Sequence, residues 1–240
     1  MTIGGAGILF GDRTGGVSAP PFDTANAGYS RGDDPDAVAE NRRRAGAALG
    51  GAGSDPGRWF CLRQVHGADV IDAVPAQDPL PPGDASVTTD PNATLAILTA
   101  DCGPLALIAP GATGAVHAGW RGLSAGVVEA AVARTRALAA GDVTAVLGPC
   151  VHPCCYEFSP SDLAVLVARY GPAVESTTRD GRPALDLPAA IRVALDRAGV
   201  RDVEDLSTCT ACSPNHFSHR RDGRTGLQVM LLTGPGGDGG

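Results

Sequence analysis

TLAILTADCGPLALIAPGATGAVHA, the stretch at residues 94–118, decides the fold of this chain. Apolar and β-branched residues fill it on both sides of Asp101-Cys102-Gly103. This pattern predicts two buried strands within residues 94–108, broken by a tight turn or bulge at the cysteine. A further short strand is predicted at residues 114–118, followed by a turn at residues 119–122. The stretch therefore places a cysteine and a histidine at the ends of buried strands.

Outward from this stretch, hydrophobic periodicity predicts both helices and strands. Helices are predicted at residues 36–49, 124–140, 161–170 and 188–198, and further strands at residues 58–74, 143–147 and 227–232. Residues 1–30 are predicted to form short extended pieces, and residues 75–83 a proline-rich loop. Helices and strands mix without strict alternation, which predicts one α+β domain over residues 1–232 and a disordered tail at residues 233–240.

The charge of the chain argues against two classes of partner. The 240 residues carry a formal net charge of -7, whereas nucleic-acid and anionic-membrane binders present basic surfaces. The basic run at residues 42–44 falls in a predicted helix beside acidic neighbours, as expected for a solvated or salt-bridged face. No stretch approaches the roughly 20 apolar residues that span a bilayer, and the N-terminus lacks the pattern of a signal peptide. We expect a cytoplasmic protein.

All 19 basic residues are arginine. The absence of lysine excludes Schiff-base chemistry, a P-loop lysine and a lysine general base. Any site for phosphate or carboxylate must therefore use arginine, backbone amides or a metal ion.

One cysteine and two histidines are candidate ligands of a metal ion. His66, Cys102 and His117 each lie where a predicted strand meets a turn, and such positions project side chains from a rigid sheet into a cleft. A thiolate and two imidazoles can bind zinc through three ligands and leave its fourth position open, as in a catalytic site. The spacing leaves equally open a buried core cysteine with histidines in ordinary hydrogen bonds, because no close pair such as HxxxH occurs.

The segment after His117 is a candidate anion site. Ala-Gly-Trp-Arg-Gly leads into a predicted helix, whose N-terminal amides and partial positive charge suit an anion. Arg121 could add a bidentate contact to phosphate. The alternative is that Trp120 belongs to the core and Arg121 forms a surface ion pair.

Five of the seven cysteines lie in the later part of the chain. The odd total excludes complete pairing within the chain, and thiols are expected in a reducing compartment. The five are Cys150, Cys154, Cys155, Cys209 and Cys212. They could form a structural zinc or iron–sulfur site, but their CxxxC and CxxC spacings lack a second matching CxxC. We therefore favour small buried hydrophobes for Cys154, Cys155 and Cys209. His152, His216 and His219 could extend such a metal site, but we expect them on loops.

With these residues in view, the chain resembles the laccase-domain family, also called multicopper polyphenol oxidases or YfiH-like proteins. The segments that carry the resemblance are GDDPDAVAENRRR at 32–44, QVHGADV at 64–70, DASVTTDPNATLAILTADCGPLAL at 84–107, AVHAGWRGLSAGVV at 115–128, LGPCVHPCCYEF at 147–158 and CTACSPNHFSHRRDGRTG at 209–226. They cover nearly the whole chain, and ADC followed by HAGWRG is highly specific.

The resemblance implies a single catalytic domain of α/β/β/α layers with mixed sheets, similar to that of a bacterial deamidating toxin. It implies that His66, Cys102 and His117 bind zinc, with copper as an alternative metal because copper out-competes zinc at nitrogen and sulfur ligands. It further implies a purine nucleoside phosphorylase. Such an enzyme converts adenosine, inosine, guanosine or methylthioadenosine and phosphate to the base and ribose-1-phosphate, and also deaminates adenosine.

Within this function, the residues themselves suggest individual roles. Cys102 binds the metal as a thiolate, Arg121 holds phosphate while it attacks the ribose C1′, and Asp101 is the nearest candidate for proton transfer or for orienting a ligand. The expected partners are nucleoside and phosphate rather than nucleic acid or a membrane, and the oligomeric state stays open.

Three alternatives remain beside this function. The first is a hydrolase that removes L-serine from a muramic acid precursor of the cell wall, with Cys102 as nucleophile. The second is a non-enzymatic scaffold or metal store. The third, a copper-dependent polyphenol oxidase, is disfavoured because five histidines without an HxH motif do not suit several coppers.

Two positions depart from the family pattern. The usual TGR is Thr225-Gly226-Leu227 here, and the usual serine–tyrosine–arginine is Ser218-His219-Arg220. If this segment contributes to substrate binding, the specificity inferred from the family is weakened.

Overall fold

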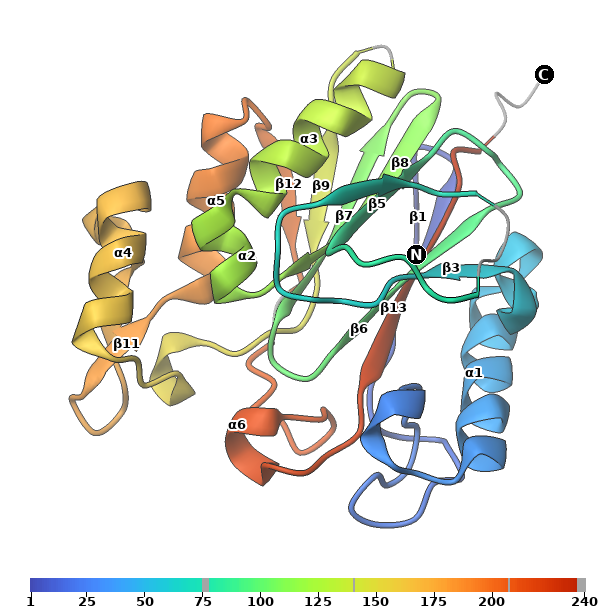
Figure 1. Cartoon of the computed structure of the whole chain (residues 1–240), viewed down its shortest axis with the longest axis horizontal. Coiled ribbons are helices and arrows are strands. Elements are labelled where there is room, and N and C mark those ends of the chain that lie inside the picture. The colour runs from blue at the N-terminus through green and yellow to red at the C-terminus, as the bar shows by residue number, and fades with distance from the viewer. Residues whose placement is uncertain (75–77, 140, 207, 237–240) are drawn as a thin grey trace.

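The computed structural model describes residues 1–74, 78–139, 141–206 and 208–236. Two mixed β-sheets pack face to face, and helices cover the outer face of each (Figure 1). In order, the strands of the first sheet are β1 (Thr2–Ile3), β2 (Ala6–Phe10), β13 (Gln228–Thr233), β6 (Thr94–Thr99) and β3 (Trp59–Cys61). Those of the second are β12 (Asp202–Asp205), β9 (Thr144–Leu147), β7 (Gly103–Ala109), β8 (Ala112–Ala118), β5 (Ala85–Thr88) and β4 (Val70–Asp72). This is the α/β/β/α layering that the resemblance implied, and the single α+β domain is confirmed.

All α-helices except the last, short one divide between the two outer faces (Figure 1). The helices are α1 (Pro35–Leu49), α2 (Trp120–Ala125), α3 (Val127–Leu138), α4 (Pro160–Tyr170), α5 (Leu187–Arg197) and the short α6 (His219–Asp222). Helix α1 covers the first sheet, while α2 to α5 gather on the side of the second. A separate hairpin joins β10 (Glu175–Thr177) to β11 (Pro183–Leu185).

Apolar side chains fill three layers. Ile97, Ile108 and Leu232 belong to the cluster between the sheets. Val128 of α3 and Ile191 of α5 belong to the cluster that the helices form with the second sheet. A domain built this way buries both faces of its sheets, which explains the apolar runs without alternation.

Residues 94–118 cross from one sheet to the other. Strand β6 lies in the first sheet and β7 in the second, so residues 100–102 form the crossing. Every residue of β7 and β8 is buried, and Gly111, with φ of 86°, makes the tight turn between them. The two strands predicted on either side of the cysteine are confirmed, and the strand predicted at residues 114–118 is longer than expected.

The continuous strand predicted at residues 58–74 is wrong. It is split into β3 and β4, which belong to different sheets, and a loop joins them. The amides of residues 65–67 in this loop bind the side chain of Asp84 rather than a neighbouring strand. His66 therefore lies in a second crossing between the sheets.

The turn predicted at residues 119–122 is also wrong, because helix α2 begins at Trp120. The Leu123 amide donates to the Gly119 carbonyl and closes the first turn of that helix. Gly126, with φ of 92°, then separates α2 from α3, so the helix predicted at residues 124–140 is interrupted. Residue 140 lies outside the described residues.

The remaining predicted elements agree with the structure apart from their ends. Strands β5, β10, β11 and β12 and the short helix α6 were missed because runs of three or four residues carry little periodic signal. In the segment expected as a tail, Thr233 ends β13 and the Gly234 amide donates to the Ala93 carbonyl. Residues 237–240 of that segment, and residues 75–77 of the predicted loop, lie outside the described residues.

Candidate metal site and cavity

His66, Cys102 and His117 come together at one end of the two sheets. Their candidate ligand atoms all lie within 4.8 Å of one another. The two imidazole rings meet edge to face, with centroids 4.8 Å apart. His66 and Cys102 lie in the two crossings between the sheets, and His117 lies near the end of β8. Strand register brings all three to the same end, since Gly103 pairs with Ala118 and β3 runs parallel to β6.

Asp84 organises this site, and it is the functional residue that sequence reasoning missed. Its buried carboxylate accepts hydrogen bonds from the amides of Val65, His66 and Gly67 at 3.1, 2.9 and 2.7 Å. Three successive amides around one anion form a backbone nest. The nest holds His66 at a φ of 61°, a left-handed conformation that few residues other than glycine adopt.

The same carboxylate fixes the second histidine. Asp84 Oδ1 lies 2.7 Å from His117 Nδ1, and the His117 amide donates to the Asp84 carbonyl at 2.7 Å. With Nδ1 committed to Asp84, Nε2 of His117 is the ring nitrogen left for a metal ion. A carboxylate behind a metal-binding histidine fixes its tautomer and raises its basicity. In the sequence, the only sign of this role is that Asp84 is a single carboxylate directly before the buried strand β5.

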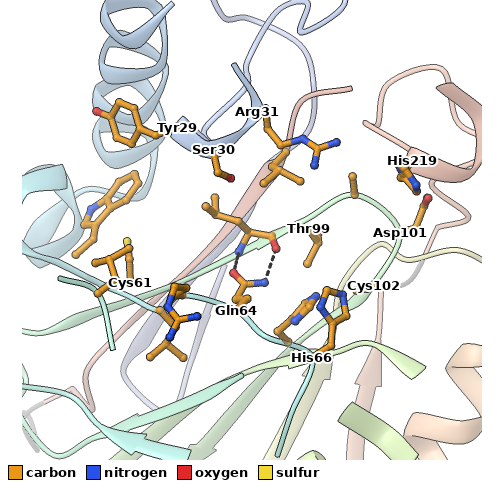
Figure 2. Close-up of a pocket in the computed structure, with 18 of the residues that line it drawn as sticks. Tyr29, Ser30, Arg31, Cys61, Gln64, His66, Thr99, Asp101, Cys102 and His219 are labelled. Carbon is orange, nitrogen blue, oxygen red and sulfur yellow. Dashed lines mark hydrogen bonds between the residues drawn. The ribbon is translucent and has the colours of Figure 1, made fainter. Parts of the chain in front are cut away.

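The side chain of Gln64 ties the loop of His66 to the first sheet. Its amide nitrogen donates to the Leu98 carbonyl at 2.8 Å, and its oxygen accepts from the Leu98 amide at 2.9 Å (Figure 2). These bonds extend the pairing of β3 with β6 after the backbone of β3 has turned away. These two hydrogen bonds therefore fix the start of the loop that carries His66 to the first sheet.

Cys102 and His117 form a charged pair. Burial raises the pKa of the Cys102 thiol, but the adjacent His117, with a smaller contribution from His66, lowers it to about 6. Burial lowers the pKa of His117, but Cys102 and Asp84 raise it to about 9. At neutral pH the thiol is therefore a thiolate, which is both the metal-binding and the nucleophilic form of cysteine.

These residues fit a metal ion of intermediate softness. One thiolate and two imidazoles are ligands that zinc and copper accept, and three ligands leave a position for a substrate. Gly119 keeps the site open, because a Cβ there would lie 3.1 Å from both Cys102 Sγ and His66 Cδ2.

A cavity of about 1170 Å³ opens beside the three residues. Figure 2 shows Tyr29 and Cys61 on one side of it and Asp101 and His219 on the other. Five arginines line the cavity: Arg31, Arg42, Arg63, Arg121 and Arg220. Among the described residues none of the five pairs with a carboxylate; Arg31 and Arg42 donate to the carbonyls of Thr225 and Ala27, whereas the guanidinium groups of the last three make no hydrogen bond. An acidic protein thus presents unpaired cations to one cavity, which suits an anionic ligand.

Arg121 lies in the first turn of α2, and its guanidinium carbon lies 4.4 Å from the centre of the Trp120 ring. Trp120 is half-buried and packs edge to face on Phe158. The surface ion pair considered for Arg121 finds no partner among the described residues. Helix α2 has only six residues, so any anion site here rests on the arginines rather than on a helix dipole.

Asp101 is buried, and both of its carboxylate oxygens are engaged. They accept hydrogen bonds from the Thr210 hydroxyl and from the Arg220 amide, each at 2.6 Å. Asp101 has a φ of 103°, so the loop before Cys102 is held in a conformation that side chains rarely adopt. This arrangement favours a role in positioning Cys102 over proton transfer.

Both departures from the family pattern line the cavity. Leu227 contributes to its wall, as does His219, whose Nδ1 lies 2.7 Å from the Gly223 carbonyl. Differences in specificity are therefore expected at these two residues.

The later cysteines are not all buried hydrophobes. Cys209 is buried as expected and Cys150 is buried as well, but Cys154 and Cys155 are half-buried and Cys212 is exposed. The expectation for Cys154 and Cys155 is wrong, because a turn of 3-10 helix at Pro153–Cys155 brings both toward the loop of Cys209 and Cys212.

Comparisons with known proteins agree with this architecture. The family model described as multi-copper polyphenol oxidoreductase laccase matches residues 7–233. A purine nucleoside phosphorylase of Streptomyces coelicolor is 45% identical over 231 residues, which cover 94% of each chain. One of Mycobacterium tuberculosis is 42% identical over 226 residues, covering 92% of this chain and 88% of its own.

Solved structures are similar over almost the whole chain. YlmD from Geobacillus stearothermophilus has a TM-score of 0.87 at 34% identity, covering 96% of this chain and 92% of its own. A Neisseria meningitidis protein has a TM-score of 0.85 at 30% identity, covering 97% and 95%. Within the described residues, no helix is long and apolar enough to cross a bilayer.

Proposed function

This chain belongs to the multi-copper polyphenol oxidoreductase laccase family, and we propose that it is a zinc-dependent purine nucleoside phosphorylase that also deaminates adenosine. The observation that carries the proposal is the three-ligand group at the edge of an arginine-lined cavity. The names of the relatives, 36–45% identical, support the reaction class.

His66, Cys102 and His117 would hold the zinc ion, and Asp84 would orient the two histidines. Bound there, zinc supplies a Lewis acid that polarises a substrate group or lowers the pKa of water. Zinc suits the site because it accepts mixed nitrogen and sulfur ligands in tetrahedral geometry.

Phosphorolysis requires that phosphate and nucleoside lie side by side. The unpaired guanidinium groups of Arg63, Arg121 and Arg220 would bind phosphate, and the rings of Tyr29 and Tyr156 offer flat surfaces for a base. A phosphate oxygen forms a bond to C1′ of the ribose while the bond from C1′ to the base nitrogen breaks. The base takes up a proton as it leaves. Holding the two reactants in one cavity removes much of the entropic cost of this step.

Oxidation of polyphenols is not part of the proposal, although the family model carries a laccase description. Such an enzyme needs several coppers held largely by histidines. In the described part of the chain, the one histidine-containing ligand group is that of His66 and His117.

A hydrolase that removes L-serine from a cell-wall precursor is the second candidate, because Cys102 and His117 form a thiolate–imidazolium pair. A nucleophilic thiolate with a histidine base would need no metal. Removal of zinc therefore separates the two candidates, since it abolishes phosphorolysis and leaves a cysteine hydrolase active.

The test is a product assay on zinc-loaded protein. Adenosine, inosine, guanosine and methylthioadenosine are each incubated with and without phosphate, and the products are separated by chromatography. We expect base and ribose-1-phosphate only when phosphate is present, and inosine from adenosine in either case. Absence of all these products from the zinc-loaded protein would rule the proposal out.

A further inference from the structure

A second group of ligands lies apart from His66, Cys102 and His117. The sulfur atoms of Cys154, Cys155, Cys209 and Cys212 all lie within 4.8 Å of one another. Two come from the turn at Pro153–Cys155 and two from a loop more than fifty residues later. Four thiols from two distant segments thus converge on one point.

The spacing of the sulfurs matches a single tetrahedral metal ion. Cys154 Sγ lies 3.7 Å from that of Cys155, 3.8 Å from that of Cys209 and 3.5 Å from that of Cys212. Cys155 Sγ and Cys212 Sγ are 3.3 Å apart. A zinc–sulfur bond of about 2.3 Å gives sulfur pairs about 3.8 Å apart in a tetrahedron. A disulfide holds its sulfurs about 2.05 Å apart, and a cluster of several irons needs more widely spaced thiolates.

The surroundings suit negatively charged sulfur. The His152 amide lies 3.5 Å from Cys209 Sγ, and Arg179 Nη2 lies 3.1 Å from Cys212 Sγ. Four thiolates around a divalent ion leave a net negative charge, which amide dipoles and a guanidinium offset. The Arg179 amide also donates to the Cys154 carbonyl, so the cation is tied to the same segment.

The loop that carries Cys209 and Cys212 is held in place independently of any ion. The amides of Cys212 and Ser213 both donate to the Cys209 carbonyl and form a tight turn. Arg221 donates to the carbonyls of Thr210 and Ser213. Such a preformed loop lowers the entropic cost of binding a metal.

We propose that Cys154, Cys155, Cys209 and Cys212 form a structural tetrathiolate zinc site. Four protein ligands close the coordination sphere, so the ion holds two loops together and binds no substrate. The site does not depend on the proposed phosphorylase activity. It nevertheless reaches the cavity, because Thr210, between two of the ligands, donates to Asp101, and Tyr156 follows Cys155.

Metal analysis of reduced full-length protein tests this proposal. After exposure to excess zinc and gel filtration, we expect about two zinc ions per chain. Cys212→Ser, which changes an exposed residue, should lose one ion, and His66→Ala should lose the other. Cys150→Ala is the matched control, since this neighbouring cysteine lies outside the group and should retain both ions.

Cobalt gives a readout that does not depend on stoichiometry alone. In the His66→Ala protein, bound Co²⁺ should show the intense sulfur-to-cobalt absorption of four thiolates, and adding Cys212→Ser should lower it. The proposal is overturned if His66→Ala protein binds no metal, if Cys212→Ser retains both ions, or if these cysteines remain joined as disulfides in reductant. If the wild-type protein bound only the ion that Cys212→Ser removes, the proposed function would fail and this site would stand.

Discussion

The two ligand groups differ in how the chain builds them. His66, Cys102 and His117 lie where strands of two sheets end, and a buried carboxylate supports them from behind. The four cysteines lie on loops and a short turn, where hydrogen bonds to backbone carbonyls hold the segments. The first group opens on a cavity, whereas the second has a protein ligand for every position of a tetrahedron.

The first group is therefore suited to a reaction, and the second to holding two segments of the chain together. Three ligands on a rigid scaffold leave room for a substrate, and a precise scaffold preserves that geometry when an ion leaves. Four ligands on loops give an ion no free position, and the ion adds a link between two segments that hydrogen bonds already hold in shape. Changes to the first group should therefore affect activity more than folding, and changes to the second the reverse.

The largest effect is expected for Cys102→Ala. It removes the one thiolate of the histidine-containing group, and a Lewis acid supplies several kcal/mol of transition-state stabilisation. We expect kcat/KM for phosphorolysis to fall by about 10³-fold or more. Circular dichroism and Tm should change little, because the fold around Cys102 rests on the two sheets. A variant that loses activity only in proportion to its loss of folded protein would contradict the comparison.

The next effect is expected for Asp84→Asn. The one NH2 group of asparagine would face either the His66 amide or the amides of Val65 and Gly67, so a donor would meet a donor and the free energy of unfolding should fall by about 1–3 kcal/mol. Loss of the carboxylate behind His117 should weaken zinc binding by roughly 10–100-fold. Urea unfolding and competition with a chromophoric chelator measure the two quantities.

Asp72→Asn is the matched control for this variant. Asp72 is an exposed carboxylate at the end of β4, paired with Arg134 on the surface. Surface pairs contribute about 0–1 kcal/mol, so zinc affinity should stay unchanged. Equal effects of the two substitutions would show that Asp84 has no special part in the site.

The sequence was sufficient for the strands around Cys102, and with the resemblance for the meeting of His66, Cys102 and His117, but not for Asp84. Long apolar runs such as 94–108 indicate strands that are buried on both faces of a sheet. Spacing alone left open whether His66, Cys102 and His117 form one site, and the resemblance implied that they do. Asp84 is 18 residues from His66 and 33 from His117, and a lone carboxylate at those distances predicts nothing. Its role follows from two crossings between sheets that no local pattern encodes.

For the later cysteines, the sequence raised a metal site as one alternative but favoured buried hydrophobes, for a similar reason. The adjacent Cys154 and Cys155 match no familiar spacing of metal ligands. In the sequence, helices α4 and α5 separate them from Cys209 and Cys212. Helix boundaries failed where single glycines decide them, as at Gly126. Its left-handed conformation ends one helix and precedes the next within a continuous amphipathic pattern.

A smaller effect is expected for Gly119→Ala. The backbone of Gly119, with φ of -83°, accepts alanine without strain, but the new methyl group would lie 3.1 Å from both Cys102 Sγ and His66 Cδ2. We expect roughly a tenfold loss in kcat/KM with little change in Tm, because a small displacement at a reacting site costs rate before stability. Gly67→Ala is the matched control, since its methyl group would make only ordinary contacts at 3.7 and 3.8 Å. If both variants retain full activity, the metal site has more room than the structure indicates.

The smallest effect concerns the thiols themselves. After treatment with a chelator, Cys102 should react with iodoacetamide as a thiolate, at a rate that is constant near neutral pH and falls by about half near pH 6. The sign follows from the lowered pKa, because acid converts the thiolate to the unreactive thiol as the pH falls through that value. Cys61 lines the same cavity, but burial raises its pKa, so its rate should still rise between pH 7 and 9. Peptide mass spectrometry separates the two sites, and added zinc should protect Cys102 alone. If Cys102 followed the profile of Cys61, His117 would not be stabilising a thiolate, and the support for a cysteine nucleophile would fall with it.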